Sequence, residues 1–189
     1  MQKIRVLVAA SFFVLTSACL WARESKIEVR GAAFAPREKL YRSIYGDLGG
    51  SFEIELSQSL ANYLDIWGNV SWTPKHGKTV EFDSATKINQ VSLSFGIKCM
   101  GCIGKGLEGY VGIGPIFTQA MIKDTSYCGQ QTKNTEPEVG VVLKTGLYRA
   151  LGECLFVIIF ADYRYQPAEL PREVDLGGLR IGIGFGRRF

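Results

Sequence analysis

Histidine, proline and long apolar segments are scarce in this chain of 189 residues. It contains one histidine and six prolines, and its net charge is only +4 with no long basic run. After Ala22 no apolar run approaches the ~20 residues of a membrane-spanning helix; the longest occupies residues 154–161. A helical membrane anchor after Ala22 is therefore excluded, and nucleic acid is a poor candidate partner.

The single histidine offers little basis for catalysis. His76 stands in a predicted connection with Lys75 and Lys78, and the first Asp and Ser after it are Asp83 and Ser84. A catalytic histidine needs a nucleophile or carboxylate within reach, so we expect His76 to be a surface residue and the chain not to be an enzyme. Its glycine-rich stretches precede no helical pattern, which argues against a phosphate-binding loop. No cofactor and no metal site are predicted.

The amino terminus has the order of charge and hydrophobicity of a secretory signal peptide. Lys3 and Arg5 precede an apolar stretch over residues 6–15, and small residues follow. About ten apolar residues are too few to cross a bilayer as a helix. We therefore predict a cleaved signal peptide at residues 1–22 and one exported domain at residues 23–189, although cleavage after Ala18 also fits. In that second case Cys19 would loosely resemble a lipoprotein acylation site.

The rest of the chain alternates between apolar and polar residues with a period of two. The last segment shows it most clearly: Leu179, Ile181, Ile183 and Phe185 alternate with Arg180 and three glycines. Such alternation indicates β-strands. The pattern recurs in eight segments, at residues 26–35, 50–57, 63–72, 89–98, 107–117, 138–148, 154–165 and 176–189. No helical pattern is evident between them, so the predicted fold class is all-β.

The connections between these segments alternate in length. Four are long, at residues 36–49, 73–86, 118–136 and 166–175, and three are short, at residues 58–62, 99–106 and 149–153. Alternating lengths are typical of an up-and-down antiparallel meander with its long loops at one end and its short turns at the other. With an even number of strands, both ends of the meander lie on the short-turn side.

The two faces of the strands differ in a way that predicts a transmembrane barrel. One face is bulky and apolar, with aromatic residues near the strand ends, whereas the other mixes glycine and serine with charges of both signs. The charged residues of the second face are Glu28, Arg30, Glu53, Glu55, Asp65, Lys98, Glu108, Glu138, Lys144, Asp162, Arg164 and Arg180. A transmembrane barrel has its apolar face toward lipid, and paired charges would fill the narrow lumen of an eight-stranded barrel.

A closed sheet follows from the same argument, because hydrocarbon tolerates no unpaired backbone edge. The first strand must then pair with the eighth. Two alternatives remain open at this point: a narrow porin-like channel, and a soluble, secreted, lipocalin-like binding barrel with the opposite sidedness.

This architecture and the terminal strand resemble those of the small eight-stranded outer-membrane β-barrels of bacteria, of the OmpA-barrel and OmpX kind. The resemblance covers residues 26–189 and implies a location in the bacterial outer membrane, contact with outer-membrane lipid, and a structural or surface-interaction role. It also implies that Phe189, with Phe185, forms the signal read by the barrel-assembly machinery. Arg187 stands where a second aromatic is usual in this class.

The cysteines predict disulfides, because an exported protein meets an oxidising compartment. Cys99 and Cys102 form the motif CMGC in one short turn, Cys154 stands beside the next one, and Cys128 belongs to the third long connection. Cys154 would bond Cys99 or Cys102. The unmatched thiols would then be free to link the barrel to other envelope proteins by disulfides.

The long connections mix charges of both signs. Basic side chains in them, among them Lys75, Lys78 and Lys123, would either be solvated or contact anionic lipid headgroups just above the membrane plane.

Overall fold

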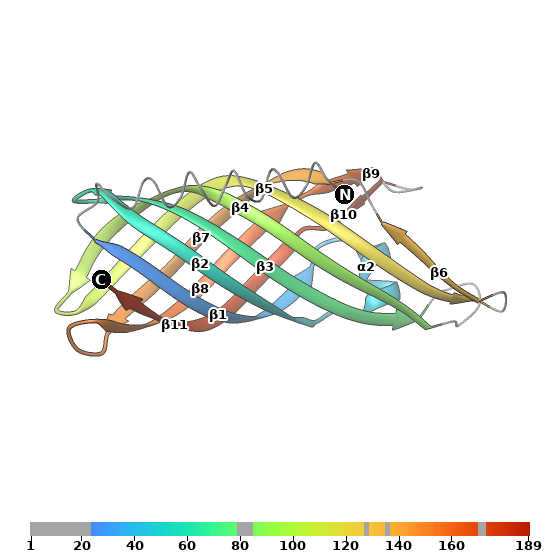
Figure 1. Cartoon of the computed structure of the whole chain (residues 1–189), viewed down its shortest axis with the longest axis horizontal. Coiled ribbons are helices and arrows are strands. Elements are labelled where there is room, and N and C mark those ends of the chain that lie inside the picture. The colour runs from blue at the N-terminus through green and yellow to red at the C-terminus, as the bar shows by residue number, and fades with distance from the viewer. Residues whose placement is uncertain (1–23, 79–84, 127–128, 135–136, 170–172) are drawn as a thin grey trace.

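The chain forms a closed antiparallel β-barrel (Figure 1), in a computed structural model that describes residues 24–78, 85–126, 129–134, 137–169 and 173–189. Eight strands are hydrogen-bonded in a ring in which each pairs with its neighbours along the chain. They are β1 (Ser25–Pro36), β2 (Gly49–Ala61), β3 (Leu64–Lys78), β4 (Ala85–Gly104), β5 (Leu107–Ser126), β7 (Glu138–Ala150), β8 (Leu155–Tyr165) and β11 (Gly178–Arg188). The predicted all-β, eight-stranded, up-and-down barrel is thus confirmed.

The seam between the first and last strands closes the ring. β1 and β11 pair in register from Lys26 opposite Arg188 to Pro36 opposite Gly178. Beyond the strands, the main chains of Ser25 and Phe189 exchange two hydrogen bonds of 3.0 Å. The terminal phenylalanine therefore belongs to the closing seam, and the sheet has no free edge along the ring.

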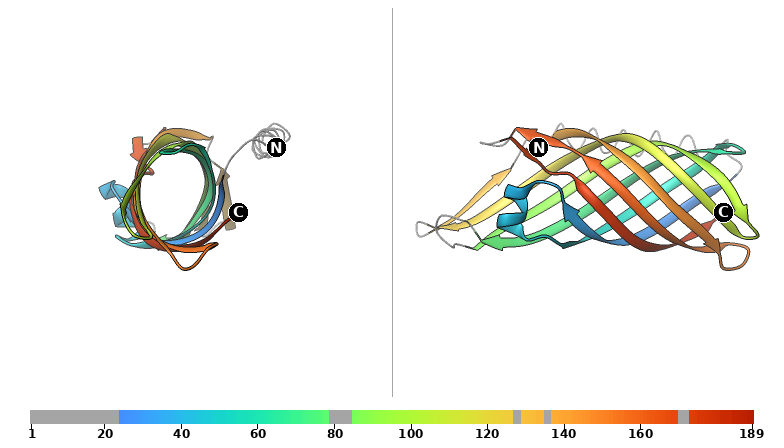
Figure 2. Two further views of the ribbon diagram at one scale, coloured as in Figure 1. Left: turned by 90° about the vertical axis from the view of Figure 1, so that its left-hand side faces the viewer. Right: turned by 180° about the vertical axis from the view of Figure 1, so that it is seen from behind.

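The short turns and the two ends of the ring lie at the same end of the barrel (Figure 2). Two of the turns contain a glycine with positive φ, Gly106 at 70° and Gly152 at 114°. Glycine adopts this left-handed backbone conformation without the strain that a Cβ would add. The two glycines therefore allow tight hairpin turns.

The other end of the barrel is more structured than the sequence pattern predicts. A short helix, α2 (Lys39–Tyr45), occupies the first long connection, and Glu38 caps it by accepting a hydrogen bond from the amide of Leu40. The expectation of no helix between strands is therefore wrong. Seven residues give less than two full turns, too few for a recognisable helical period.

The second and third long connections are mostly strand rather than loop. β3, β4 and β5 contain 15, 20 and 20 residues and continue past the predicted strand ends. β6 (Gly129–Asn134) pairs with the extension of β5, so this hairpin projects beyond the ring (Figure 1). In the fourth connection, β9 (Pro167–Glu169) pairs with β10 (Glu173–Asp175). Among the described residues, no helix is long and apolar enough to cross a membrane.

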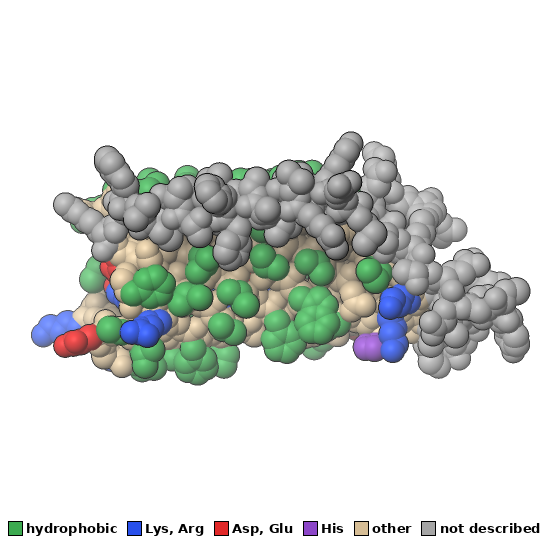
Figure 3. All heavy atoms as spheres, viewed as in Figure 1, with side chains coloured by type: hydrophobic (Ala, Val, Ile, Leu, Met, Phe, Trp, Pro, Cys, Tyr) green, Lys and Arg blue, Asp and Glu red, His purple; other side chains and the backbone are tan. Residues whose placement is uncertain are grey.

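One face of each ring strand carries apolar side chains that point outward, as Figure 3 shows for one side of the barrel. Ile113, Leu143 and Ile183 have exposed fractions of 48, 49 and 60 %. Inside, aromatic and aliphatic clusters lie toward either end of the lumen, and charged side chains lie between them. This sidedness is the opposite of that of a soluble barrel.

Candidate functional site

A layer of charged side chains fills the middle of the barrel, and Glu53 of β2 is its most connected member. Four cations from other strands donate hydrogen bonds to the Glu53 carboxylate. They are Arg180 at 2.6 Å, Lys144 at 2.9 Å, and Arg30 and Arg164 at 3.3 Å each. Because these cations belong to β11, β7, β1 and β8, one carboxylate ties together much of the barrel wall.

Glu55, two residues further along β2, faces the same interior and forms a second centre. It accepts hydrogen bonds from Lys98, from Lys144, from Arg30 at 2.8 Å and from Asn69 at 3.3 Å. Lys144 and Arg30 therefore contact both glutamates. Such sharing satisfies several donors of each cation at once, which is what makes burial of these charges tolerable.

Glu28 extends this network toward the short-turn end. Its carboxylate accepts hydrogen bonds from Arg30 Nε at 2.7 Å and from the Tyr148 hydroxyl at 2.8 Å. That hydroxyl in turn accepts a hydrogen bond of 3.1 Å from Lys98. The Lys98 ammonium also lies 4.6 Å from the centre of the Tyr110 ring, a distance that allows a cation–π contact.

Inward-facing glycines make room for the aromatic side chains. A Cβ on Gly186 of β11 would lie 2.2 Å from Cζ of Phe156, and one on Gly146 would lie 2.7 Å from Cε1 of Tyr110. The glycine alternation in the last strand therefore follows from the packing of a narrow lumen.

Asp162 is the least well satisfied member of the charged layer. Its side chain is fully buried, yet neither carboxylate oxygen has a hydrogen-bond partner within the described chain, and its nearest cation is Lys144 at 3.7 Å. Arg180 is its register partner across the sheet and keeps Nε and Nη2 unpaired. The central layer thus holds five cations and four carboxylates, namely Arg30, Lys98, Lys144, Arg164 and Arg180 against Glu28, Glu53, Glu55 and Asp162.

The lumen is sealed at this layer. Glu55, Lys98 and Arg180 each have an exposed fraction of 0 %, so no water-sized space reaches them from either end. Although the ribbon in Figure 2 looks open along its axis, side chains fill the space that it encloses.

The end of the barrel near α2 is closed by a second, largely apolar layer. Tyr41 of α2 packs with Phe34 and Ile88, and its hydroxyl accepts a 3.2 Å hydrogen bond from Gln90. Lys75 lies against the rings of Tyr41 and Phe34 and donates to the carbonyl oxygen of Gly46 at 2.8 Å. Burial raises the pKa of the Tyr41 hydroxyl above its usual range, so this hydroxyl stays neutral.

Comparison with solved structures shows which known proteins share this fold. The outer membrane protein OprG from Pseudomonas aeruginosa has a TM-score of 0.66 at 14 % identity, over 89 % of this chain and 96 % of that one. The chain has the fold of the small bacterial outer-membrane β-barrels. No family model matches it, and no curated protein matches its sequence.

Two further outer-membrane barrels are similar. Neisserial surface protein A has a TM-score of 0.57 at 13 % identity, over 88 % of this chain and 96 % of that one. Ail, the attachment invasion locus protein of Yersinia pestis, was solved in complex with the heparin analogue sucrose octasulfate. It has a TM-score of 0.56 at 18 % identity, over 89 % of this chain and all of that one.

Ten of the twelve charged residues that the sequence assigns to the interior of the barrel are buried in it. The exceptions are Glu108 and Glu138, which are half-buried near opposite ends. Two interior cations lie outside the predicted set: Lys26 pairs with Asp65 at 3.0 Å, and Arg188 pairs with Glu108 at 2.9 Å. Extending the period of two by one step on β1 and β11 would have found both.

The predicted disulfide is not formed among the described cysteines: Cys99, Cys102 and Cys154 are free and exposed. CMGC lies within β4 rather than in a turn, and the rise of three extended residues places the Cα atoms of its two cysteines about 10 Å apart along the strand. β5 and β7 stand between β4 and the start of β8, whereas a disulfide needs Cα atoms within about 7 Å. Cys128 lies outside the described residues.

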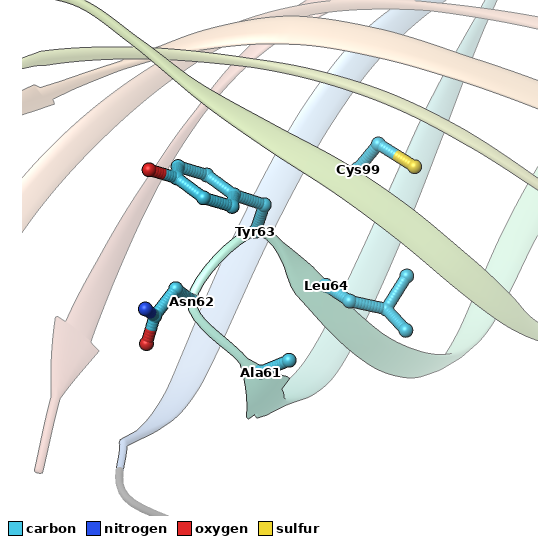
Figure 4. Close-up of a pocket in the computed structure, with 5 residues that line it drawn as sticks. All are labelled: Ala61, Asn62, Tyr63, Leu64 and Cys99. Atoms are coloured by element: carbon cyan, nitrogen blue, oxygen red, sulfur yellow. The ribbon is translucent and has the colours of Figure 1, made fainter.

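The three free thiols lie at or near the short-turn end of the barrel. Cys99 points outward from β4 into an open groove lined by Leu64 and by the turn between β2 and β3 (Figure 4). A disulfide link to another envelope protein stays a prediction, and these thiols and Cys128 are the groups that would form it.

The remaining sequence predictions concern residues on the outer surface. His76 is exposed on the outer wall of β3. Phe185 and Phe189 are exposed at the end of the last strand, and their role as an assembly signal stays a prediction. The predicted signal peptide lies outside the described residues.

Proposed function

We propose that this chain is an integral protein of the bacterial outer membrane with a structural or surface-interaction role. One observation carries the proposal: a closed ring of strands has an apolar outer wall and a sealed, ion-paired interior. An apolar exterior of this extent is unfavourable in water and favourable in lipid, which argues against the soluble lipocalin-like alternative. Export would use the signal peptide at residues 1–22.

The two ends of the barrel support an orientation. Short turns face the periplasm and longer connections the outside in barrels of this class. In that orientation α2 and the projecting hairpin of β5 and β6 face the cell surface. A surface-interaction role agrees with the names of two similar proteins, a surface protein and an attachment invasion locus protein.

Extraction of membranes tests the proposal directly. Envelopes from cells that express the full chain are washed with alkaline carbonate, and the protein is expected to stay in the pellet because lipid covers its outer wall. A soluble periplasmic protein from the same cells is the control and should be released. Release of both proteins to the same extent would refute membrane insertion.

Conduction is the second candidate activity, and the sealed charged layer argues against it. Filling by side chains is the expected state of an eight-stranded lumen, and here the central carboxylates and cations are inaccessible to water. In planar bilayers the purified barrel is therefore expected to produce no stable openings, as in a bilayer treated with detergent alone. Large, stable openings would instead establish a channel.

A further inference from the structure

Three titratable or cationic side chains form a row on the outer wall near the end that carries α2. The row consists of His76 on β3, Lys87 on β4 and Lys123 on β5. His76 pairs in register with Lys87, and Lys87 pairs in register with Lys123. All three side chains are exposed. Residues directly opposite on neighbouring strands have Cβ atoms about 4.5–5.5 Å apart, so the three can converge on one small group.

No carboxylate whose side chain is described compensates this row. Among residues 24–77, 86–123, 137–167 and 175–189, no ion pair or hydrogen bond joins any of the three side chains to an acidic residue. Like charges directly opposite each other destabilise a sheet. The two lysines therefore repel each other unless an anion lies between them.

The row lies just beyond the apolar wall. On β3 the outward residues run from Val70 and Trp72, which are exposed and apolar, to His76 four residues further on. Four residues of a strand tilted by about 40° rise roughly 10 Å along the barrel axis. Figure 3 shows the purple histidine beside blue basic side chains where the green apolar surface ends. Tryptophan is typical of the membrane interface, so the row lies at or just above the headgroups.

We propose that His76, Lys87 and Lys123 bind the phosphate of an outer-leaflet glycolipid of the lipid A class. Lysine ammonium groups form short, charge-assisted hydrogen bonds to phosphate oxygens. The site is an open wall rather than a pocket, so the acyl chains must hold the lipid against Val91 and Trp72 while its phosphate meets the row. The proposal rests on the membrane insertion proposed above, and it adds the chemical class of a bound lipid.

Lipid binding by the full barrel in zwitterionic detergent micelles tests this proposal. Lipid A carrying two phosphates is titrated against the parent protein, and the same lipid without phosphates is titrated in parallel; native mass spectrometry counts the adducts. Near an anionic surface each basic residue contributes about 1 kcal/mol. The K87Q/K123Q double variant is therefore expected to bind the phosphorylated lipid about 30-fold more weakly.

The matched control is K105Q, which removes an exposed lysine from the turn at the other end of the same hairpin. It should bind the phosphorylated lipid as the parent does. Equal binding of both lipid forms, or equal weakening by K105Q, would overturn the lipid site. Gel mobility without heating distinguishes failure of the lipid site from failure of the proposed membrane insertion. A double variant that still migrates as a folded barrel retains insertion. A parent protein that never folds in micelles contradicts the proposed function itself.

Discussion

Replacing Glu53 with glutamine is expected to lower the free energy of unfolding by about 3–5 kcal/mol, because it removes one partner from a buried ion network. The variant keeps the shape of the side chain but loses the charge that faces Arg30, Lys144, Arg164 and Arg180. Five cations would then face three carboxylates in a layer that water does not reach. Urea unfolding of the barrel in phospholipid vesicles, followed by tryptophan fluorescence, measures the change.

The control for this prediction is Glu108→Gln. Glu108 also forms an ion pair, with Arg188 at 2.9 Å, but both side chains are partly exposed at the rim. Exposed pairs contribute roughly 0–1 kcal/mol, so E108Q should unfold almost as the parent does. If E53Q and E108Q shifted the urea midpoint equally, the central layer would have to be open to water, and the sealed lumen would be disproved.

Much of the barrel can be predicted from the sequence because lipid and lumen impose opposite demands on successive residues. In β11, Ile181 and Ile183 face outward while Arg180 faces inward. That contrast repeats along each strand and reveals both the strands and their faces. In β8 the contrast is confined to the half that holds Asp162 and Arg164, because Phe156, Ile158 and Phe160 make the inner face of the other half apolar as well.

The same reasoning fails where the contrast of environments disappears. Beyond the apolar wall the outward side chains no longer need to be apolar, so residues 73–78 of β3 show no apolar alternation and the pattern predicts a loop there. Pairing with β4 continues there nonetheless, from Thr73 opposite Gln90 to Lys78 opposite Ala85. Backbone hydrogen bonds, which the side-chain pattern does not report, extend the strands.

The ion-pair partners within the lumen also cannot be predicted from the alternation of apolar and polar residues. Alternation predicts that Glu53 and Lys144 both face inward, but 91 residues separate them. Their contact depends on the ring order and on the stagger of the strands, which no local signal encodes. The row formed by His76, Lys87 and Lys123 has the same origin, because only the register of β3, β4 and β5 brings the three residues side by side.

Introducing lysine at Ile183 tests the sidedness on which the proposed function depends. Ile183 points outward from the middle of β11, opposite Ile159 and Gly31, and its exposed fraction is 60 %. In a barrel surrounded by lipid, a lysine near the bilayer midplane costs about 2–4 kcal/mol. We therefore expect I183K to fold in vesicles with its free energy of unfolding reduced by that amount, measured by urea titration.

The size of this stability loss shows whether lipid or water surrounds Ile183, because replacing an isoleucine that is exposed to water costs much less. On the surface of a soluble barrel the same substitution changes stability by no more than about 0.5 kcal/mol. Leu151→Lys provides the matched control, since Leu151 is also exposed but belongs to a short turn at the rim, where a lysine near the interface costs about 0–1 kcal/mol. A loss in I183K no larger than that in L151K would mean that hydrocarbon does not surround the middle of the wall.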